Sequence, residues 1–210
     1  PIKLLSMQKL VSTILLIVLF ISCGETKEKK TNQNTSQDKT EESTEDLSSA
    51  DYNSLLINYE CDMTVTEVAG VLNLSETAVV LADYQSPGKC SFAIEGFGKN
   101  PLGDDTVVIW FLEELGKAQV SKEIKSYLDE QANNEEVLSM DIELSETGDS
   151  YIVKRPANGQ VVIMNGNYDH WLVLSYSPKH SYKSRTTEQH AELGAKMVDL
   201  ANYLLKKHKK

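Results

Sequence analysis

The 210-residue sequence predicts an α+β fold, a largely antiparallel sheet of about six or seven strands packed with an N-terminal, a middle and a C-terminal helix. Short apolar stretches separated by hairpin-type turns predict antiparallel strands. Two stretches open with capping-box spacing and a third repeats apolar residues at helical spacing. The resulting order is helix, three strands, helix, four strands, helix, which is typical of helices packed on an antiparallel sheet.

The first helix is predicted in "MTVTEVAGVLNL", residues 63–74, because Thr64 and Glu67 have the spacing of a capping box. "AVVLADY" at 78–84 reads as a strand. The turn "SPG" then leads into a second strand, "CSFAIEGF", at 90–97.

Residues 96–105, "GFGKNPLGDD", are rich in glycine, proline and aspartate and are expected to form a loop. The next stretch, "TVVIWFLEE" at 106–114, is apolar on successive residues. Such a run predicts a strand that is covered on both faces. Trp110 within it is expected in the core.

The middle helix is predicted at 117–134, with an apolar stripe of Val120, Ile124, Leu128 and Ala132. After it, "VLSMDIEL" at 137–144 alternates between apolar and polar residues. This alternation predicts a strand with one buried and one wet face, the buried one carrying Leu138, Met140, Ile142 and Leu144.

Three more strands are predicted within residues 150–177, joined by "PANG" and "GNYD", which are typical of hairpin turns. The last helix is expected to begin at Thr186, since Gln189 follows it at capping-box spacing. Its apolar stripe consists of Leu193, Met197, Leu200 and Leu204.

The N-terminal part differs in character from this domain. Residues 10–21, "LVSTILLIVLFI", would make a helix of about 18 Å, too short for a bilayer core of about 30 Å. Lys9 precedes the run and Met7 stands where a start is expected, so residues 1–22 read as a signal peptide, with 1–6 as upstream sequence. The cysteine that ends this segment is discussed next as a lipidation site. The alternatives to that reading are a plain signal peptide and an N-terminal anchor helix that happens to end in cysteine.

The end of the apolar run, Ser22-Cys23-Gly24, resembles the lipobox of bacterial lipoproteins, although Phe20 stands where that family usually has leucine. The resemblance implies that Cys23 is lipidated and becomes the mature N-terminus. It also implies a membrane-anchored lipoprotein of the bacterial cell envelope, on the periplasmic or the cell-surface side. Several acyl chains hold a protein on a membrane stably, whereas one does not.

Residues 24–50 are rich in threonine, serine, glutamate, lysine, asparagine and glutamine, with Leu47 as the one large apolar residue. Such a segment cannot bury enough apolar surface to offset its ordering entropy. We therefore expect 23–50 to be a lipidated cysteine followed by a disordered tether, and 51–210 to be a single α+β domain.

The net charge of the predicted domain limits which partners it can bind. Residues 51–210 hold 15 of the 21 basic but 24 of the 31 acidic residues. An acidic domain is a poor partner for nucleic acid, which requires a basic face. The exception is "KKHKK" at 206–210, for which we expect a frayed, solvated helix end rather than a patch for lipid or nucleic acid.

The chain has three cysteines, and once Cys23 is assigned to lipid, Cys61 and Cys90 remain as an even pair. An exported chain meets an oxidising compartment, which favours a disulfide between them. Two free, buried thiols are the alternative.

The domain also resembles the PsbP-like α-β-α sandwich class of small envelope lipoproteins, over roughly residues 55–207. A cysteine before a "T-x-x-E-V" helix, a second cysteine opening a strand, and a long closing helix carry the likeness. The resemblance implies a helix–sheet–helix fold and a role as a binding or assembly factor. It transfers no functional residue.

A search for chemistry finds no GxSxG, HExxH, P-loop or GxGxxG motif. Asp169-His170-Trp171 is the most chemical-looking cluster, but neighbouring residues on a strand point to opposite faces. We expect there a turn aspartate, a surface histidine and a core or edge tryptophan. Asp104-Asp105 reads as loop solvation rather than a cation site, and the glycine-rich loop at 96–103 could form a mobile rim.

The sequence therefore predicts no catalytic, cofactor-binding or metal-ligating residue. We expect an envelope lipoprotein that acts as a non-enzymatic binding or assembly factor for an envelope protein or a small ligand. The alternative is an enzyme for cell-wall or exported substrates, whose acids and histidine come together only in the fold.

Overall fold

The computed structural model describes residues 50–133 and 140–210. The predicted signal peptide, Cys23 and the tether up to residue 49 lie outside these ranges, as do residues 134–139. Within the described ranges, none of the helices combines the length and apolarity needed to cross a membrane.

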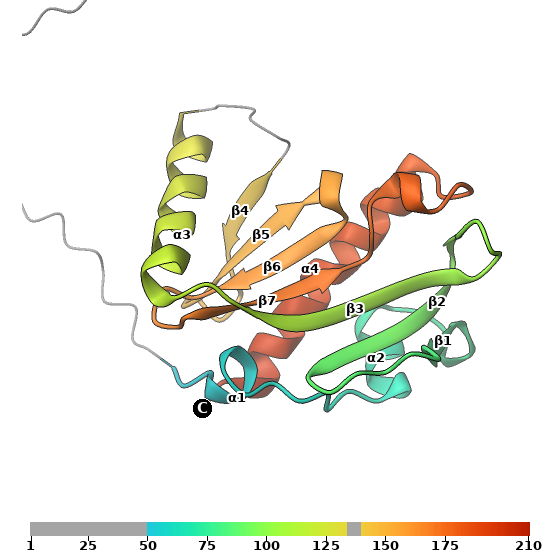
Figure 1. Ribbon diagram of the computed structural model, residues 1–210, viewed down its shortest axis with the longest axis horizontal. Coiled ribbons are helices and arrows are strands. Elements are labelled where there is room, and N and C mark those ends of the chain that lie inside the picture. The colour runs from blue at the N-terminus through green and yellow to red at the C-terminus, as the bar shows by residue number, and fades with distance from the viewer. Residues whose placement is uncertain (1–49, 134–139) are drawn as a thin grey trace, which may run out of the picture. The chain divides into compact units, whose positions relative to one another are not determined.

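The α+β prediction is confirmed: seven strands form one antiparallel sheet in the order β1-β2-β3-β7-β6-β5-β4 (Figure 1). The described strands are β1 Val79–Leu81, β2 Lys89–Lys99, β3 Asp105–Glu114, β4 Asp141–Leu144, β5 Tyr151–Arg155, β6 Gln160–Met164 and β7 His170–Ser175. The described helices are α1 Asn53–Leu56, α2 Val65–Val71, α3 Lys117–Ala132 and α4 Thr187–His208.

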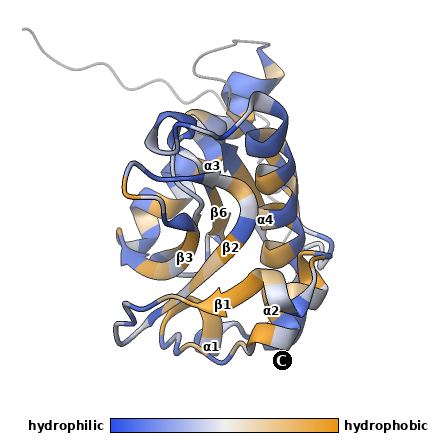
Figure 2. Cartoon of the chain, turned by 90° about the vertical axis from the view of Figure 1, so that its right-hand side faces the viewer, coloured by the Kyte–Doolittle hydropathy of each residue, from blue (hydrophilic) through white to orange (hydrophobic). Residues whose placement is uncertain are grey.

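Helices cover both faces of the sheet. On one face α4, α1 and α2 enclose a large core around Trp110 and Leu200. On the opposite face α3 encloses a smaller core around Val120, Val162 and Trp171. Figure 2 shows α2 and β1 gathered beside α4, at the end of the domain where residue 210 lies.

Both predicted capping boxes are present. The Thr64 side chain accepts from the Glu67 amide while the Glu67 carboxylate accepts from the Thr64 amide. Thr186 and Gln189 do the same at the start of α4. Each pair satisfies two backbone N–H groups that a helix start leaves without intrahelical partners. The short helix α1 was not predicted, because its four residues have no cap signal.

The loop expected at 96–105 is shorter than predicted. β2 continues through Lys99, and its pairing with β3 shifts register between Ile94 and Lys99. Gly96 and Gly98 have φ of 94° and 92°, so the glycines produce a bulge within the strand rather than ending it.

The expectation that β3 is covered on both faces is wrong. Thr106, Val108 and Trp110 are fully buried on the α4 side, whereas Val107 and Ile109 on the other side are only half-buried. The reason is that α3 lies mainly over the β4–β7 half of the sheet, and of the β3 residues it is Phe111 that packs against the α3-side core.

Two apolar stripes are also corrected. In α3 the buried residues are Val120, Ile124 and Tyr127, while Leu128 is 36% exposed. Of the buried face predicted around β4, Leu138 lies outside the described residues and Met140 is half-buried. Ile142 is buried but Leu144 is 51% exposed, because β4 is the last strand of the sheet. The stripe predicted for α4 is confirmed: Leu193, Met197, Leu200 and Leu204 are fully buried.

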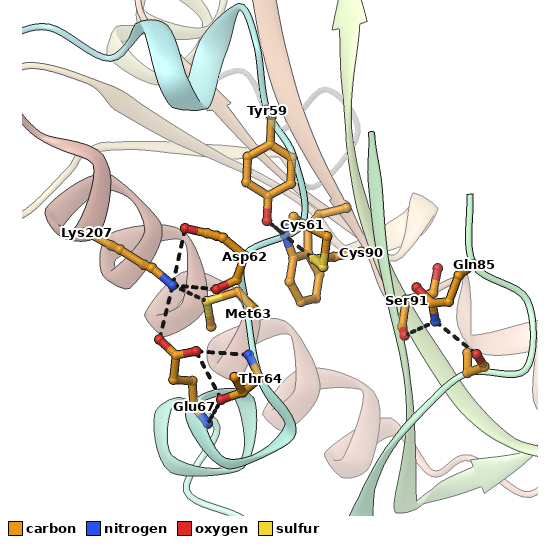
Figure 3. Close-up of a disulfide and its surroundings, with 12 residues drawn as sticks. Tyr59, Cys61, Asp62, Met63, Thr64, Glu67, Gln85, Cys90, Ser91 and Lys207 are labelled. Carbon is orange, nitrogen blue, oxygen red and sulfur yellow. Dashed lines mark hydrogen bonds and ion pairs between the residues drawn. A yellow bond between two sulfur atoms is a disulfide. The ribbon is translucent and has the colours of Figure 1, made fainter. Parts of the chain in front are cut away.

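Cys61 and Cys90 lie at disulfide distance, with Cα atoms 5.1 Å apart, inside the range of about 4.4–6.8 Å that bridged cysteines require. Figure 3 shows the bridge next to Tyr59. It joins the segment before α2 to the start of β2, so the predicted pairing is confirmed in its geometry.

The prediction of a frayed end at 206–210 is wrong. α4 remains helical through His208, which is 8% exposed. Lys207 lies 3.0 Å from Glu67 and 3.3 Å from Asp62, and Lys206 pairs with Glu146. These cations are therefore engaged by acids of the same domain.

The two ends of the domain also bind each other. The Asp51 amide donates to the Lys210 carbonyl at 3.1 Å, and the Lys210 amide donates to the Asp51 carbonyl at 3.2 Å. Residue 51 therefore lies beside the end of α4 (Figure 1).

Candidate functional site

The residues that the sequence singled out for chemistry have structural partners. Asp169 and His170 do meet, with Oδ1 2.6 Å from Nδ1, which contradicts the expectation that they point apart. Asp169 precedes β7 and belongs to the turn, so strand alternation does not apply to it. Trp171 is buried and donates its indole N–H to Glu113.

The other singled-out residues also serve the fold. Asp105 pairs with Lys99 across the β2–β3 turn, and Asp104 accepts from the Asn100 side chain within that turn. Trp110 is fully buried and donates to the Tyr59 hydroxyl. Across the described residues, His, Cys, Asp and Glu side chains form no group of three that could hold a metal ion.

A different part of the chain forms a site. A cavity of about 560 Å³ opens between the segment after β7, the start of α4 and the turn after β5. We call it the Arg185 pocket, and its lining includes five basic side chains: Lys179, His180, Lys183, Arg185 and His190. No aspartate or glutamate belongs to that lining.

Arg185 is the central residue of the pocket and is only 3% exposed. Its guanidinium donates to the carbonyls of Phe97, Tyr176 and Ser177 and to the hydroxyl of Thr106, all at 2.9 Å. All of these acceptors are neutral. Among the described residues no carboxylate pairs with this cation, and burial lowers the pKa of the guanidinium.

A buried charge without an opposite charge is costly, even when neutral groups satisfy its hydrogen bonds. The backbone around Arg185 is constrained to permit it. Gly98 has φ of 92°, and a Cβ there would lie 2.9 Å from Arg185 Cβ. Ser177, whose carbonyl accepts from Arg185, has a φ of 63° that is unusual for a residue with a side chain. Backbone strain of this kind concentrates at functional sites.

His190 extends the polar wall of the pocket. Its Nε2 lies 2.8 Å from the Pro156 carbonyl, which can only accept, so Nε2 carries the proton. Its other ring nitrogen, Nδ1, lies 3.5 Å from the Arg185 guanidinium. His190 therefore keeps the guanidinium in place without supplying a negative charge.

The rim of the pocket adds more positive charge. Lys179 and Lys183 are exposed, Lys179 donates to Thr187, and neither has a carboxylate partner in the part of the chain described. The first turn of α4 also lies here, and a helix N-terminus carries partial positive charge. Glu188 lies in that first turn, and its pKa is lowered by hydrogen bonds at the helix start and, more weakly, by Lys179.

These features make the Arg185 pocket suited to an anion. The sequence analysis missed it, although a signal was present: "SPKHSYKSR" at 177–185 holds four basic residues in a domain that is otherwise acidic. Residues in irregular segments have no periodicity, so neither their burial nor the meeting of Arg185 with Thr106 could be deduced from spacing.

In comparisons with known proteins, no family model, no curated protein and no solved structure matches the chain.

Proposed function

We propose that this protein is a non-enzymatic binding lipoprotein of the bacterial cell envelope, which captures a small anionic ligand in the Arg185 pocket. The observation that carries the proposal is the buried guanidinium of Arg185, which has no carboxylate partner among the described residues. A bound carboxylate or phosphate would supply the missing charge through charge-assisted hydrogen bonds from the lysines. The lipobox-like Cys23 supports the anchored location.

Binding is favoured over catalysis because of where the acid–histidine pairs of the described residues lie. Asp169 and His170 line neither the Arg185 pocket nor the second cavity described below. Asp62 and His208 pair at the end of α4 and line neither cavity. The polar groups of Arg185 are already committed to backbone carbonyls and Thr106. Such an arrangement positions a charge, and the lining holds no aspartate or glutamate that could pair with His180 or His190 as an acid–histidine couple.

The test is calorimetric titration of the detergent-solubilised full chain with inorganic phosphate and with acetate. The double variant Lys179→Gln/Lys183→Gln removes two pocket cations while leaving buried Arg185 in place. Because each lost charge-assisted hydrogen bond is worth about 1.5–3 kcal/mol, affinity should fall at least about tenfold.

The matched control is Lys117→Gln/Lys122→Gln on α3, where both lysines are exposed. It makes the same change in net charge, so it corrects for the long-range field of the protein. Affinity should be nearly unchanged in the control. Failure of the unaltered chain to bind either anion, or equal losses in the two double variants, would refute the proposed function.

A further inference from the structure

A second cavity of about 490 Å³ lies on the other side of Pro156, between α4 and strands β4–β6. We call it the α4 groove. Its apolar lining comes from Val161 of β6, from Val198 and from small residues of α4, namely Ala191, Gly194 and Ala195. Small side chains on the helix leave room that larger ones would fill.

The groove contains a polar group without a protein partner. The side chain of Tyr176 lines it and is 2% exposed, yet its hydroxyl makes no hydrogen bond with any described residue. The hydroxyl oxygen does not belong to the fully buried side-chain atoms that lack a partner, so solvent in the groove reaches it and a ligand oxygen could take the place of that solvent. Burial also raises the pKa of Tyr176, which keeps the hydroxyl protonated and able to donate.

The absence of a side chain at Gly194 leaves room for that hydroxyl. A Cβ at position 194 would lie 2.9 Å from the Tyr176 hydroxyl oxygen, so any side chain there would press on it. The oxygen therefore lies at the wall of the groove beside α4, where a ligand atom could reach it.

Charge at the rim of the groove opposes that of the Arg185 pocket. Asp141 and Asp199 both line the groove. The remaining charged residue, Lys154, is engaged by Asp141 at 2.6 Å and Glu143 at 2.9 Å. An anion is thus disfavoured in the groove and favoured in the neighbouring pocket.

The two cavities are adjacent. Pro156 lines both of them, and consecutive residues of α4, His190 and Ala191, line one each. The rings of His190 and Tyr176 pack with centroids 5.1 Å apart. The Tyr176 carbonyl accepts from Arg185 while the Tyr176 side chain lines the groove. A ligand of moderate length would therefore extend from one cavity into the other over Pro156.

We propose that the α4 groove holds the apolar body of the ligand whose anionic group lies in the Arg185 pocket, with the Tyr176 hydroxyl as its polar contact. The ligand class is then an amphiphilic anion: a carboxylate or phosphate joined to an apolar chain that carries a hydroxyl or carbonyl oxygen. This inference rests on the proposed function and adds the identity of the ligand's uncharged part.

The test compares acetate, octanoate and 8-hydroxyoctanoate as probes of the full chain. Burying one methylene is worth about 0.8 kcal/mol, or about fourfold in affinity. Octanoate should therefore bind at least about tenfold more tightly than acetate. Ala195→Leu narrows the groove at an exposed helix position and should remove that gain while leaving acetate unchanged.

The control is Ala118→Leu, the same change at an exposed position of α3. It should keep the full gain for octanoate. A second variant, Tyr176→Phe, removes only the unpartnered hydroxyl and should weaken 8-hydroxyoctanoate several-fold without weakening octanoate.

The outcomes separate the two proposals. If acetate and octanoate bind equally, or if Ala195→Leu leaves the gain intact, the groove is not the apolar subsite, even though anion capture stands. If Tyr176→Phe affects both octanoates alike, the assignment of its hydroxyl is wrong. If none of the probes and no phosphate binds, both the groove and the Arg185 pocket proposals are overturned.

Discussion

At the scale of single residues, Tyr59 connects the disulfide to the core. Its hydroxyl accepts from the Trp110 indole at 2.6 Å and lies 3.4 Å from Cys90 Sγ, which as a disulfide sulfur can only accept. Burial raises the pKa of Tyr59, so the hydroxyl stays protonated and fills both roles. Trp110 in turn stacks on Phe92 with ring centroids 5.5 Å apart.

Replacing Tyr59 by phenylalanine should therefore destabilise the domain. It leaves the indole N–H of fully buried Trp110 without an acceptor, which costs about 1–3 kcal/mol in unfolding free energy. Urea unfolding followed by tryptophan fluorescence measures the loss. Tyr84→Phe is the control, because Tyr84 is 78% exposed and should change stability little; an equal effect of both variants would contradict the account.

The disulfide makes a second prediction at this scale. Closing a loop over a sequence separation of 29 residues contributes about 3.5 kcal/mol in the chain-entropy model. The Cys61→Ser/Cys90→Ser variant should unfold at correspondingly lower urea concentration. When the oxidised protein is treated with an alkylating reagent, its intact mass should show no alkylation at these two positions. Two alkylated thiols there would show that the pair is not bridged.

At the scale of elements, the last turn of α4 binds the first turn of α2. The Glu67 carboxylate accepts from the Thr64 amide and hydroxyl and from Lys207 (Figure 3). The pKa of Glu67 is lowered from 4.5 to about 2, and the hydrogen bond from the Thr64 backbone N–H is the largest cause. Burial lowers the pKa of neighbouring His208 as well, which keeps that ring neutral.

Acid should therefore weaken this contact. Both groups hold fewer protons in the folded than in the unfolded chain, so unfolding free energy falls as pH falls. For Glu67 the stabilisation is complete above pH 4.5 and is lost between 4.5 and about 2; for His208 the loss begins near its ordinary pKa of about 6.5.

Melting temperatures measured from pH 7 to pH 3 test this pH dependence. Glu67→Gln should flatten the decline below pH 4.5, whereas Glu60→Gln, at an exposed site, should not. Parallel declines in the two variants and the unaltered chain would rule out Glu67 as the titrating group.

Elements with a strong period or a cap signal were predicted from the sequence, and the rest were not. The α4 stripe and the β5–β7 hairpins were found because burial repeats along them. The burial of strand β3 was predicted wrongly. An apolar run shows only that both faces of a strand tolerate burial, and the position of α3 decides which face of β3 is covered. The Arg185 pocket joins the turn after β5, the segment after β7 and the start of α4, and Arg185 itself donates to β2 and β3. Contacts over such separations leave no local pattern.

At the scale of the whole molecule, the sequence predicts that residues 24–50 are dispensable for folding, because they contain almost no apolar surface. At the last of these positions, Ala50 is in fact partly buried against the core. A chain that begins at Ala50 should therefore melt within about two degrees of the full chain, since the buried core residues of the described ranges follow that position. Differential scanning calorimetry of both chains makes the comparison, and a loss of many degrees would show that the segment packs on the domain.

The lipobox-like motif makes the other prediction at this scale. Cys23→Ala should release the protein from the membrane fraction or leave its signal peptide uncleaved, because the lipidation site is absent. With the protein expressed in a bacterial host, detergent partitioning measures release from the membrane, and intact mass shows whether the signal peptide is cleaved. A mutant that partitions and weighs as the unaltered protein does would refute lipidation at Cys23.

The paired backbone bonds between Asp51 and Lys210 have a mechanical consequence. Tension on the chain before residue 50 enters the domain at Asp51 and passes directly to the far end of α4. The 22 residues of α4 span about 33 Å, with His190 in the opposite, first turn. We therefore expect pulling at residue 50 to break the Asp51–Lys210 hydrogen bonds first, while the Arg185 pocket, at the other end of α4, bears no load at that stage.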